Sequence, residues 1–370
     1  MKAFKLLSLI LTVVFLASAL AACGNGNTND PTPTPDEIIE ATPTVTPTST
    51  ATEVATATPS ATATATATAA PTSTPTPLPD ECTHNYTLDT TKANGDKRML
   101  CAYCGNAYIE PNLDDSFKIL SIGNSYSLNA IYYLQDIAKD CGAKDIVIGG
   151  LYIGGCSLNT HWETIQKNGT YQKYRKYTTS LTYTESLNTY TLEKALKEDD
   201  WDIITIQQSS ADSPFYYTYA MLSNIIRYVK QFCPETKIVW HMTWSYANSY
   251  DSSTFKKFDR DQVKMYNGIV ESIKKMVLTN GYINGVIPVG TALQNVRSTH
   301  IGDTLNPIDG THLAENYGLY TAGLTWYAYL TGKDVMSLPL TPPSSADTKE
   351  LNTLKTAVKN AIENPYEITK

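Results

Sequence analysis

The chain has 370 residues, with 29 Lys or Arg against 36 Asp or Glu, so its formal net charge is −7. This acidic balance, without a basic stripe to neutralise phosphates, argues against a nucleic-acid-binding protein. The 25 tyrosines fit ordinary core and rim packing, or a surface that faces saccharide.

Residues 1–22 have the pattern of a secretory signal, in which two lysines precede a long apolar run that ends on small residues. The sequence Leu20-Ala21-Ala22-Cys23 resembles the bacterial lipobox. The resemblance implies cleavage before Cys23 and acylation of that cysteine, for example with palmitate. An ordinary signal with a chance cysteine is the alternative. No second long apolar run follows, so we expect a lipoprotein held by lipid alone on the extracellular face of the cell membrane.

Residues 23–80 comprise the expected lipid anchor and a linker made almost entirely of Thr, Pro, Ala and Ser. Such a segment buries too little apolar surface to offset the entropy of ordering, so we predict a disordered, extended linker. At the ~3.1 Å rise of polyproline II, about 50 residues would reach at most ~150 Å.

Residues 81–112 form a small module rich in potential metal ligands. Cys82 and His84 stand before a Cys-x-x-Cys pair, Cys101 and Cys104. These ligand types and short spacings are typical of a tetrahedral structural zinc site. A disulfide in a secreted chain is the competing interpretation, and free thiols are a third.

From residue 117 onward, short β-branched runs alternate with amphipathic helical patterns. Strands are predicted at 117–122, 146–151, 203–207, 238–242 and 286–289, and helices at 129–141, 192–198, 216–232, 262–279 and 314–329. This alternation predicts an α/β domain over 116–335, a flavodoxin-like three-layer sandwich with a five-stranded parallel sheet. Residues 171–191 read as an inserted hairpin beside the site, and 336–370 as a tail with a short helix.

In such a sheet, ligands bind beyond the carboxyl ends of the strands, so the loops after the strands are where chemistry is expected. The first strand leads into Gly123-Asn124-Ser125, just before a helix. A serine at that turn lies near backbone N–H groups and the positive end of the helix dipole, which favour an oxyanion. An ordinary helix cap is the alternative explanation for these residues.

A second motif supplies what a serine nucleophile needs, a base and a carboxylate that orients it. Asp309 and His312 stand three residues apart at the start of the last predicted helix, although Asp309 could instead serve only as a helix cap. The other histidines are weaker rivals. His241 lies in an apolar strand, and His161 and His300 have no carboxylate three residues before them.

Two further loops contain candidate oxyanion donors. Gly155 follows the second strand, where a glycine can offer its N–H without an obstructing Cβ. Gln208, or less favourably Gln207, follows the third strand and carries an amide that can donate to an oxyanion. A tight turn and ordinary polar strand ends are the alternatives.

Taken in chain order, these four blocks resemble the SGNH or GDSL hydrolases. The resemblance covers residues 117–329 and implies a serine esterase with Ser125 as nucleophile, His312 as base and Asp309 as the residue that orients it. It also implies that the N–H groups of Ser125 and Gly155 line the oxyanion hole. Asn124 stands where the family usually has Asp, and Gln208 where it has Asn.

The usual reaction in that family is deacylation, often of acetylated sugars, without a catalytic cofactor. The resemblance therefore implies an acylated saccharide or another small ester as the substrate. Two other classes compete with the esterase. A non-catalytic solute- or glycan-binding lipoprotein would normally have two similar lobes, and a flavin-binding module would need a hydroxyl-rich phosphate loop.

Overall fold

The computed structural model describes residues 82–180, 183–343 and 346–369. The expected signal 1–22, the lipidation site Cys23 and the linker 23–80 lie outside the described residues. In the described part, no helix is both long and apolar enough to cross a bilayer.

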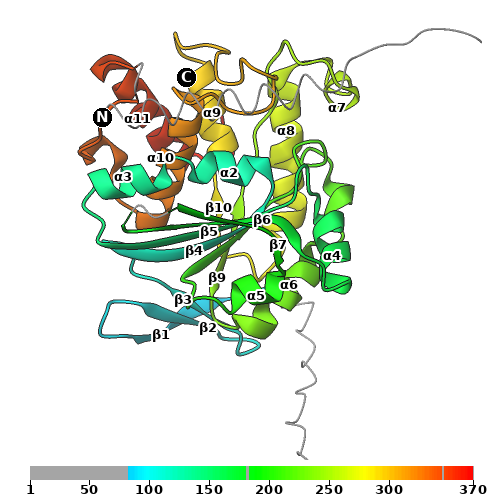
Figure 1. The fold of residues 1–370 in the computed structure, drawn as a ribbon, viewed down its shortest axis with the longest axis vertical. Helices are drawn as coiled ribbons and strands as arrows, with labels where there is room; N and C mark the ends of the chain where they lie inside the picture. The colour runs from blue at the N-terminus through cyan, green and yellow to red at the C-terminus, as the bar shows by residue number, and fades with distance from the viewer. Residues whose placement is uncertain (1–81, 181–182, 344–345, 370) are drawn as a thin grey trace, which may run out of the picture. The chain divides into compact units, whose positions relative to one another are not determined.

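A mixed sheet forms the centre of the domain (Figure 1). Its parallel part agrees with the five strands expected from the sequence: β4 (Ser116–Gly123), β5 (Asp145–Tyr152), β8 (Ile203–Ile206), β9 (Lys237–His241) and β10 (Val286–Ile287). Their order in the sheet, β10-β9-β8-β4-β5, is the flavodoxin-like order in which the first strand lies between the second and the third.

The sheet has seven strands, so the predicted count of five was too low. A hairpin of β6 (Tyr171–Thr178) and β7 (Tyr183–Tyr190) extends the sheet antiparallel to β5. The sequence pattern identified this hairpin as an insertion but did not show that it continues the sheet. Tyr171 and Tyr174 are buried, and Tyr174 stacks on Tyr190 at 4.1 Å, so the tyrosines of this segment attach the hairpin to the core.

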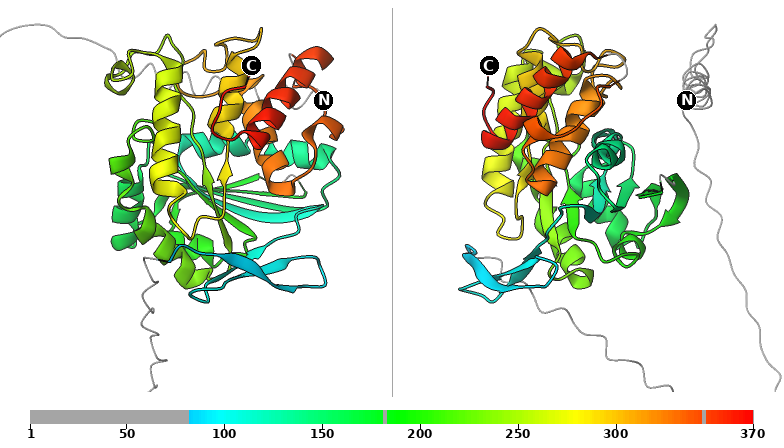
Figure 2. Two further views of the ribbon diagram at one scale, coloured as in Figure 1. Left: turned by 180° about the vertical axis from the view of Figure 1, so that it is seen from behind. Right: turned by 90° about the vertical axis from the view of Figure 1, so that its left-hand side faces the viewer.

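Helices pack on the sheet in two groups (Figure 2). The chain reverses its direction across the sheet after β5, and right-handed crossovers then place the helices before and after the reversal on opposite faces. The first group is α2 (Ser125–Ile131), α3 (Leu134–Asp140), α9 (Val289–Arg297), α10 (Gly318–Thr331) and α11 (Thr348–Glu363). The second contains α4 (Leu158–Gln166), α5 (Leu192–Leu196), α6 (Leu222–Phe232) and α8 (Gln262–Ser272). Short helices are η2 (Tyr216–Tyr219), α7 (Ser253–Lys256), η3 (Ile273–Val277) and η4 (Val335–Ser337).

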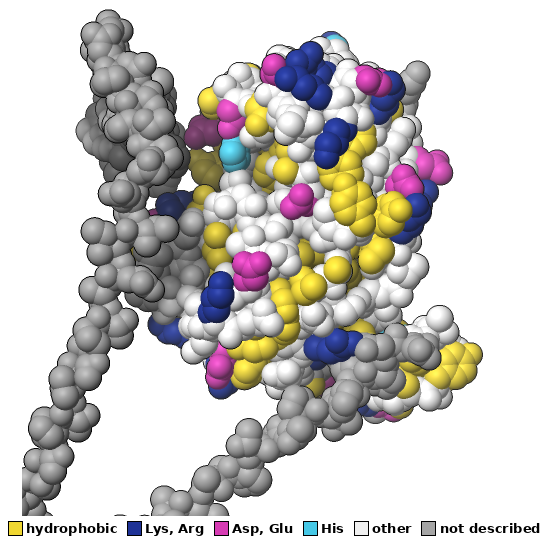
Figure 3. Space-filling model, turned by 90° about the vertical axis from the view of Figure 1, so that its right-hand side faces the viewer, with side chains coloured by type: hydrophobic (Ala, Val, Ile, Leu, Met, Phe, Trp, Pro, Cys, Tyr) yellow, Lys and Arg dark blue, Asp and Glu magenta, His cyan; other side chains and the backbone are white. Residues whose placement is uncertain are grey.

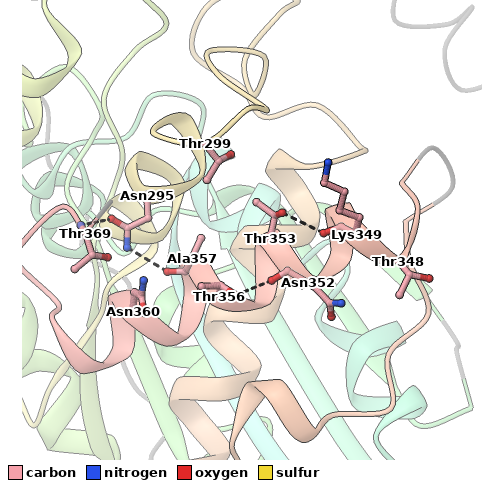
Figure 4. A pocket seen from close by; sticks show the side chains of 10 residues that line it. All are labelled: Asn295, Thr299, Thr348, Lys349, Asn352, Thr353, Thr356, Ala357, Asn360 and Thr369. Carbon is pink, nitrogen blue, oxygen red and sulfur yellow. Dashed lines mark hydrogen bonds between the residues drawn. The ribbon is translucent and has the colours of Figure 1, made fainter.

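The described residues of the segment 336–370 are part of the domain rather than a tail with a short helix. Helix α11 has 16 residues, begins with a capping box formed by Asp347 and Glu350, and packs on α9 and α10. A groove of about 620 Å³, lined mainly by Asn and Thr residues, lies between α9 and α11 (Figure 4). None of the predicted site residues lines this groove.

A small antiparallel sheet precedes the main one, with strands β1 (Tyr86–Thr91), β2 (Lys97–Cys101) and β3 (Ala107–Glu110). It contacts the amino ends of the main strands, where the Ile109 N–H donates to the Glu235 carbonyl at 2.7 Å and Lys237 pairs with Glu110 at 2.5 Å. In Figures 1 and 2 it lies at one end of the domain. The carboxyl ends of the parallel strands therefore point away from it.

The surface is mixed in character. On the face at the right of Figure 1, acidic and basic side chains are interspersed, with apolar side chains between them (Figure 3). Five of the eleven exposed large apolar residues of the described part are tyrosines, including Tyr103 at 72% and Tyr217 at 65%. Such side chains offer flat apolar area together with a polar tip.

Candidate active site

Ser125 is the first residue of α2, and only Asn124 separates it from the end of β4. Asn124 caps the helix from an extended backbone, and its side-chain oxygen accepts the Tyr126 N–H at 2.9 Å. The N–H of Ser125, in the first turn, has no intrahelical acceptor. Ser125 is half-buried, so its hydroxyl is accessible while its backbone is held.

Residues 187 positions apart meet at this turn. His312 Nε2 lies 2.8 Å from Ser125 Oγ, and His312 Nδ1 lies 2.5 Å from Asp309 Oδ2. The three side chains predicted as a set are therefore in contact. Because the carboxylate can only accept, Nδ1 carries the hydrogen and Nε2 presents its lone pair to the serine hydroxyl.

Asp309 is held by its own loop. Its Oδ1 accepts the N–H groups of Thr311 and His312, each at 2.8 Å, and the Thr311 hydroxyl at 3.0 Å. Partial burial raises the pKa of Asp309, but the hydrogen bonds from His312 and Thr311 outweigh it and bring the pKa to about 2. The carboxylate is therefore charged at neutral pH.

The sequence placed Asp309 and His312 at the start of a helix, and this expectation was wrong. Helix α10 begins at Gly318, and Asp309 and His312 lie in the loop that precedes it. Asp309 caps this turn instead of a helix. Since no helix holds the loop, other contacts must fix the imidazole.

Four residues missed in the sequence supply those contacts. The Thr311 carbonyl accepts from Trp244 Nε1 at 2.9 Å and from Asn306 Nδ2 at 2.8 Å. Buried Arg297 donates in turn to Asn306 Oδ1 at 2.5 Å. Tyr126 stacks on Trp244 at 3.9 Å and presents its ring to the His312 ring at 6.1 Å. In the sequence, these four residues are marked only by their positions close to the end of a strand or helix.

A buried chain of hydrogen bonds joins the carboxyl ends of four strands beneath Ser125. Asn124 Nδ2 donates to the Cys156 carbonyl at 3.0 Å, and Gln207 Nε2 donates to Asn124 Oδ1 at 2.7 Å. Gln207 Oε1 then contacts His241 Nδ1 at 3.0 Å. Burial lowers the pKa of His241 to about 3, so it is neutral and donates from Nδ1. This chain fixes the turn that carries the serine.

Gln208 does not fit the oxyanion role predicted for it. Its Nε2 donates to the carbonyl and hydroxyl of Thr218 at 3.0 and 3.1 Å, and its Oε1 accepts the N–H groups of Leu158 and Ser209. Both amide hydrogens are thus used elsewhere. Gln207 is equally engaged with Asn124, so neither glutamine directs a free donor at Ser125.

Gly155 remains a candidate donor. It is exposed after β5 and has a φ of +61°, a conformation that favours glycine. Within the described chain, no protein acceptor is found for the N–H of Gly155 or of Ser125. These two groups are therefore available to an oxyanion.

His161 was another candidate for the base. Its side chain is buried, with Nδ1 2.9 Å from the Tyr171 hydroxyl, and burial lowers the pKa of His161 to about 4.

The predicted metal ligands also meet, away from Ser125, in the small sheet. One ligand atom from each of Cys82, His84, Cys101 and Cys104 lies within 4.8 Å of the others. The remaining cysteines of the described part are free thiols, with Cys156 and Cys233 buried and Cys141 partly buried.

Comparison with known proteins gives a family but no activity. The model of DUF4886, a domain of unknown function, matches residues 118–361. A DUF4886 family protein from Bacteroides uniformis is 39% identical with a TM-score of 0.65, and the match covers 69% of this chain and 98% of that one. No curated protein matches the chain.

Two more distant solved structures are also similar. One is a proposed SGNH hydrolase from Slackia heliotrinireducens, 19% identical with a TM-score of 0.38, covering 57% of this chain and 97% of that one. The other is a proposed GDSL-like lipase from Parabacteroides merdae, 14% identical with a TM-score of 0.34, covering 59% and 96%. At these values they say nothing about the activity of this chain.

Proposed function

We propose a function for this chain from its site geometry, because the chain belongs to the DUF4886 family, whose function is unknown. The function that the geometry supports best is a serine esterase. The observation that carries this proposal is the continuous contact from Asp309 through His312 to Ser125, with a lone pair of the base facing the hydroxyl.

In the proposed reaction, Ser125 Oγ attacks the ester carbonyl while His312 Nε2 takes the hydroxyl proton. Asp309 keeps the imidazole in the required tautomer and stabilises the imidazolium that forms. The N–H groups of Ser125 and Gly155 receive the negative oxygen of the tetrahedral intermediate. The alcohol leaves with the proton from His312, and a water activated by the same base then releases the acid. The chain supplies every group in this sequence, so no cofactor is invoked.

The exposure of the site bears on the substrate. The side chains of His312 and Asp309 are 44% and 43% exposed, and Gly155 is exposed. A large alcohol can therefore stay outside while only its acyl group reaches Ser125. This openness favours a bulky alcohol such as a saccharide, and the resemblance to the SGNH hydrolases favours a small acyl group such as acetyl.

We also propose that the enzyme is a lipoprotein on the extracellular face of the cell membrane, held through acylated Cys23. The support is the sequence pattern around that residue. Cys23→Ala should release the chain from the membrane fraction, whereas an unchanged distribution would contradict the anchor.

The decisive experiment is labelling of the full chain with a fluorophosphonate, which reacts with activated serines. We expect wild type to be labelled, Ser125→Ala to be unlabelled, and both to melt at similar temperatures. Ser127→Ala is the matched control, because the Ser127 hydroxyl donates to the Asn124 carbonyl and not to His312. It should keep the label.

Hydrolysis of p-nitrophenyl acetate and of acetylated xylan by the same proteins would then test the substrate class. A folded wild-type chain that neither takes the label nor hydrolyses any ester would overturn the esterase and favour a binding protein.

A further inference from the structure

The cluster in the small sheet has a geometry that differs from that of a disulfide. Cys82 Sγ lies 3.8 Å from Cys101 Sγ, and Cys104 Sγ lies 3.2 Å from His84 Nδ1. Sulfur atoms in a disulfide are about 2.05 Å apart. Four ligands placed at zinc distances, about 2.3 Å for sulfur and 2.0–2.1 Å for nitrogen, give a tetrahedron with edges of roughly 3.5–3.8 Å. The observed spacing leaves room for one ion at the centre.

We propose that Cys82, His84, Cys101 and Cys104 bind one zinc ion with a structural role. Three thiolates and one imidazole are soft and borderline ligands, which select zinc over magnesium or calcium. Four protein ligands also complete a tetrahedron and leave no open position for substrate. The site is therefore distinct in chemistry from the proposed esterase site.

The backbone around the cluster is arranged for this role. Cys101 ends β2, and the turn to Cys104 closes through a bond from the Gly105 N–H to the Cys101 carbonyl at 3.1 Å. The Tyr103 N–H points at Cys101 Sγ, 3.4 Å away, where it would stabilise a bound thiolate. The pairing of β1 with β2 brings His84, two residues before Tyr86, beside Cys101.

The small sheet has little apolar core of its own. All residues of β1 after Tyr86 are exposed, and within residues 82–112 only Cys101 and Ala107 are buried apolar side chains. A segment of this size needs a metal or a disulfide to be stable. The ion would supply that stability.

The cluster also connects the small sheet to the main domain. The His84 ring packs edge-on against Tyr282 at 4.8 Å, and the Tyr86 hydroxyl donates to the Gly281 carbonyl at 3.3 Å. A Cβ on Gly281 would lie 2.3 Å from His84 Cδ2 and 3.0 Å from the Cys82 carbonyl oxygen. Two of the ligands therefore press on the loop before β10, and binding of zinc would fix the small sheet against it.

The first test is metal analysis of the full chain purified from zinc-supplemented culture. We expect about one zinc per chain in wild type and below about a tenth in Cys101→Ser and Cys104→Ser, because a structural site needs all its ligands. Cys141→Ser is the matched control and should keep its zinc, since Cys141 lies outside the cluster. Metal-free wild type with cross-linked cysteines, identified by mass spectrometry, would overturn the proposal.

A second measurement uses wild type alone and does not depend on how the variants fold. After chelation, refilling with Co²⁺ should give the absorption of a tetrahedral ion with thiolate-to-metal charge transfer. Chelation should also speed proteolysis within residues 82–112 while leaving ester hydrolysis within about twofold, because the ion has no open coordination position. Absence of the cobalt spectrum would contradict the ligand set. Activity lost on chelation and restored by zinc would contradict the structural role.

Discussion

Replacement of Asp309 by Asn tests the geometry of the proposed triad with little change in shape. Asp309 Oδ1 accepts three donors, the N–H groups of Thr311 and His312 and the Thr311 hydroxyl. In the variant, the amide oxygen must take that position, because an NH₂ group there would face three donors. The amide nitrogen is then forced to the position of Oδ2, facing His312 Nδ1.

This orientation reverses the tautomer of the base. Nδ1 of His312 must now accept, so Nε2 carries the hydrogen and donates to Ser125 instead of accepting its proton. Loss of the correct tautomer in a Ser-His-Asp triad costs about ten-thousandfold in kcat. Because the Asp309 side chain is 43% exposed, water can partly replace it, and we expect a loss of about a thousand- to ten-thousandfold, roughly 4–5.5 kcal/mol.

The assay is steady-state hydrolysis of p-nitrophenyl acetate, with thermal melting to confirm folding. Glu315→Gln is the matched control, because it removes an exposed carboxylate three residues beyond His312 that accepts from the Tyr132 hydroxyl and not from His312. It should retain activity within about threefold, since exposed polar contacts contribute little. If Asp309→Asn kept kcat within tenfold of wild type, the assignment of Asp309 as the orienting residue would be refuted.

Three further changes test residues outside the proposed triad. Gln208→Ala leaves the buried N–H groups of Leu158 and Ser209 without an acceptor, so the free energy of unfolding in urea should fall by about 2–4 kcal/mol. A hundredfold loss of kcat at unchanged stability would instead restore Gln208 as an oxyanion donor. Gly123→Ala places a Cβ 2.5 Å from Ser127 Oγ and should destabilise the protein by about 1–3 kcal/mol, and an unchanged urea midpoint would contradict the close packing of this turn. Asp202 has its pKa raised to about 6 by burial, so its ionisation destabilises the fold as pH rises from about 4 through 6. Asp202→Asn keeps an acceptor for the Lys118 N–H and should be more stable than wild type by up to about 3 kcal/mol at pH 7, but equally stable below pH 4.

The parallel strands follow from short-range sequence signals, whereas the contact of Ser125 with His312 and Asp309 was expected from two short motifs and from the resemblance of their chain order to the SGNH hydrolases. β-branched runs mark buried strands, and the loops after such strands converge at one edge of the sheet. The hairpin 171–191 was recognised, but its pairing with β5 depends on buried tyrosines whose alternation resembles that of any exposed hairpin. The sequence indicated a tail at helix α11 because the apolar face of this helix is narrow. The helices on which it packs, α9 and α10, cannot be identified from the local sequence.

The role of the glutamines could not be read from the sequence for a similar reason. Gln207 and Gln208 are adjacent at a strand end, where consecutive side chains point to opposite sides. The backbone conformation there decides which side chain lies under Ser125 and which faces Thr218. Only the partners decide this, and Asn124, His241 and Thr218 come from distant segments. The same holds for Trp244, whose indole reaches a carbonyl 67 residues away.

The small sheet sits at the amino ends of the strands, and Ser125 sits at the carboxyl end of β4. The preceding chain enters the described part at Cys82, four residues before the first strand of that small sheet. Any force applied through the preceding residues therefore acts on the pole opposite the nucleophile. A tether attached there would leave the carboxyl ends of the strands, with Ser125, facing away from the point of attachment. The length of the tether would then change how far this end can reach without changing which end of the domain faces outward.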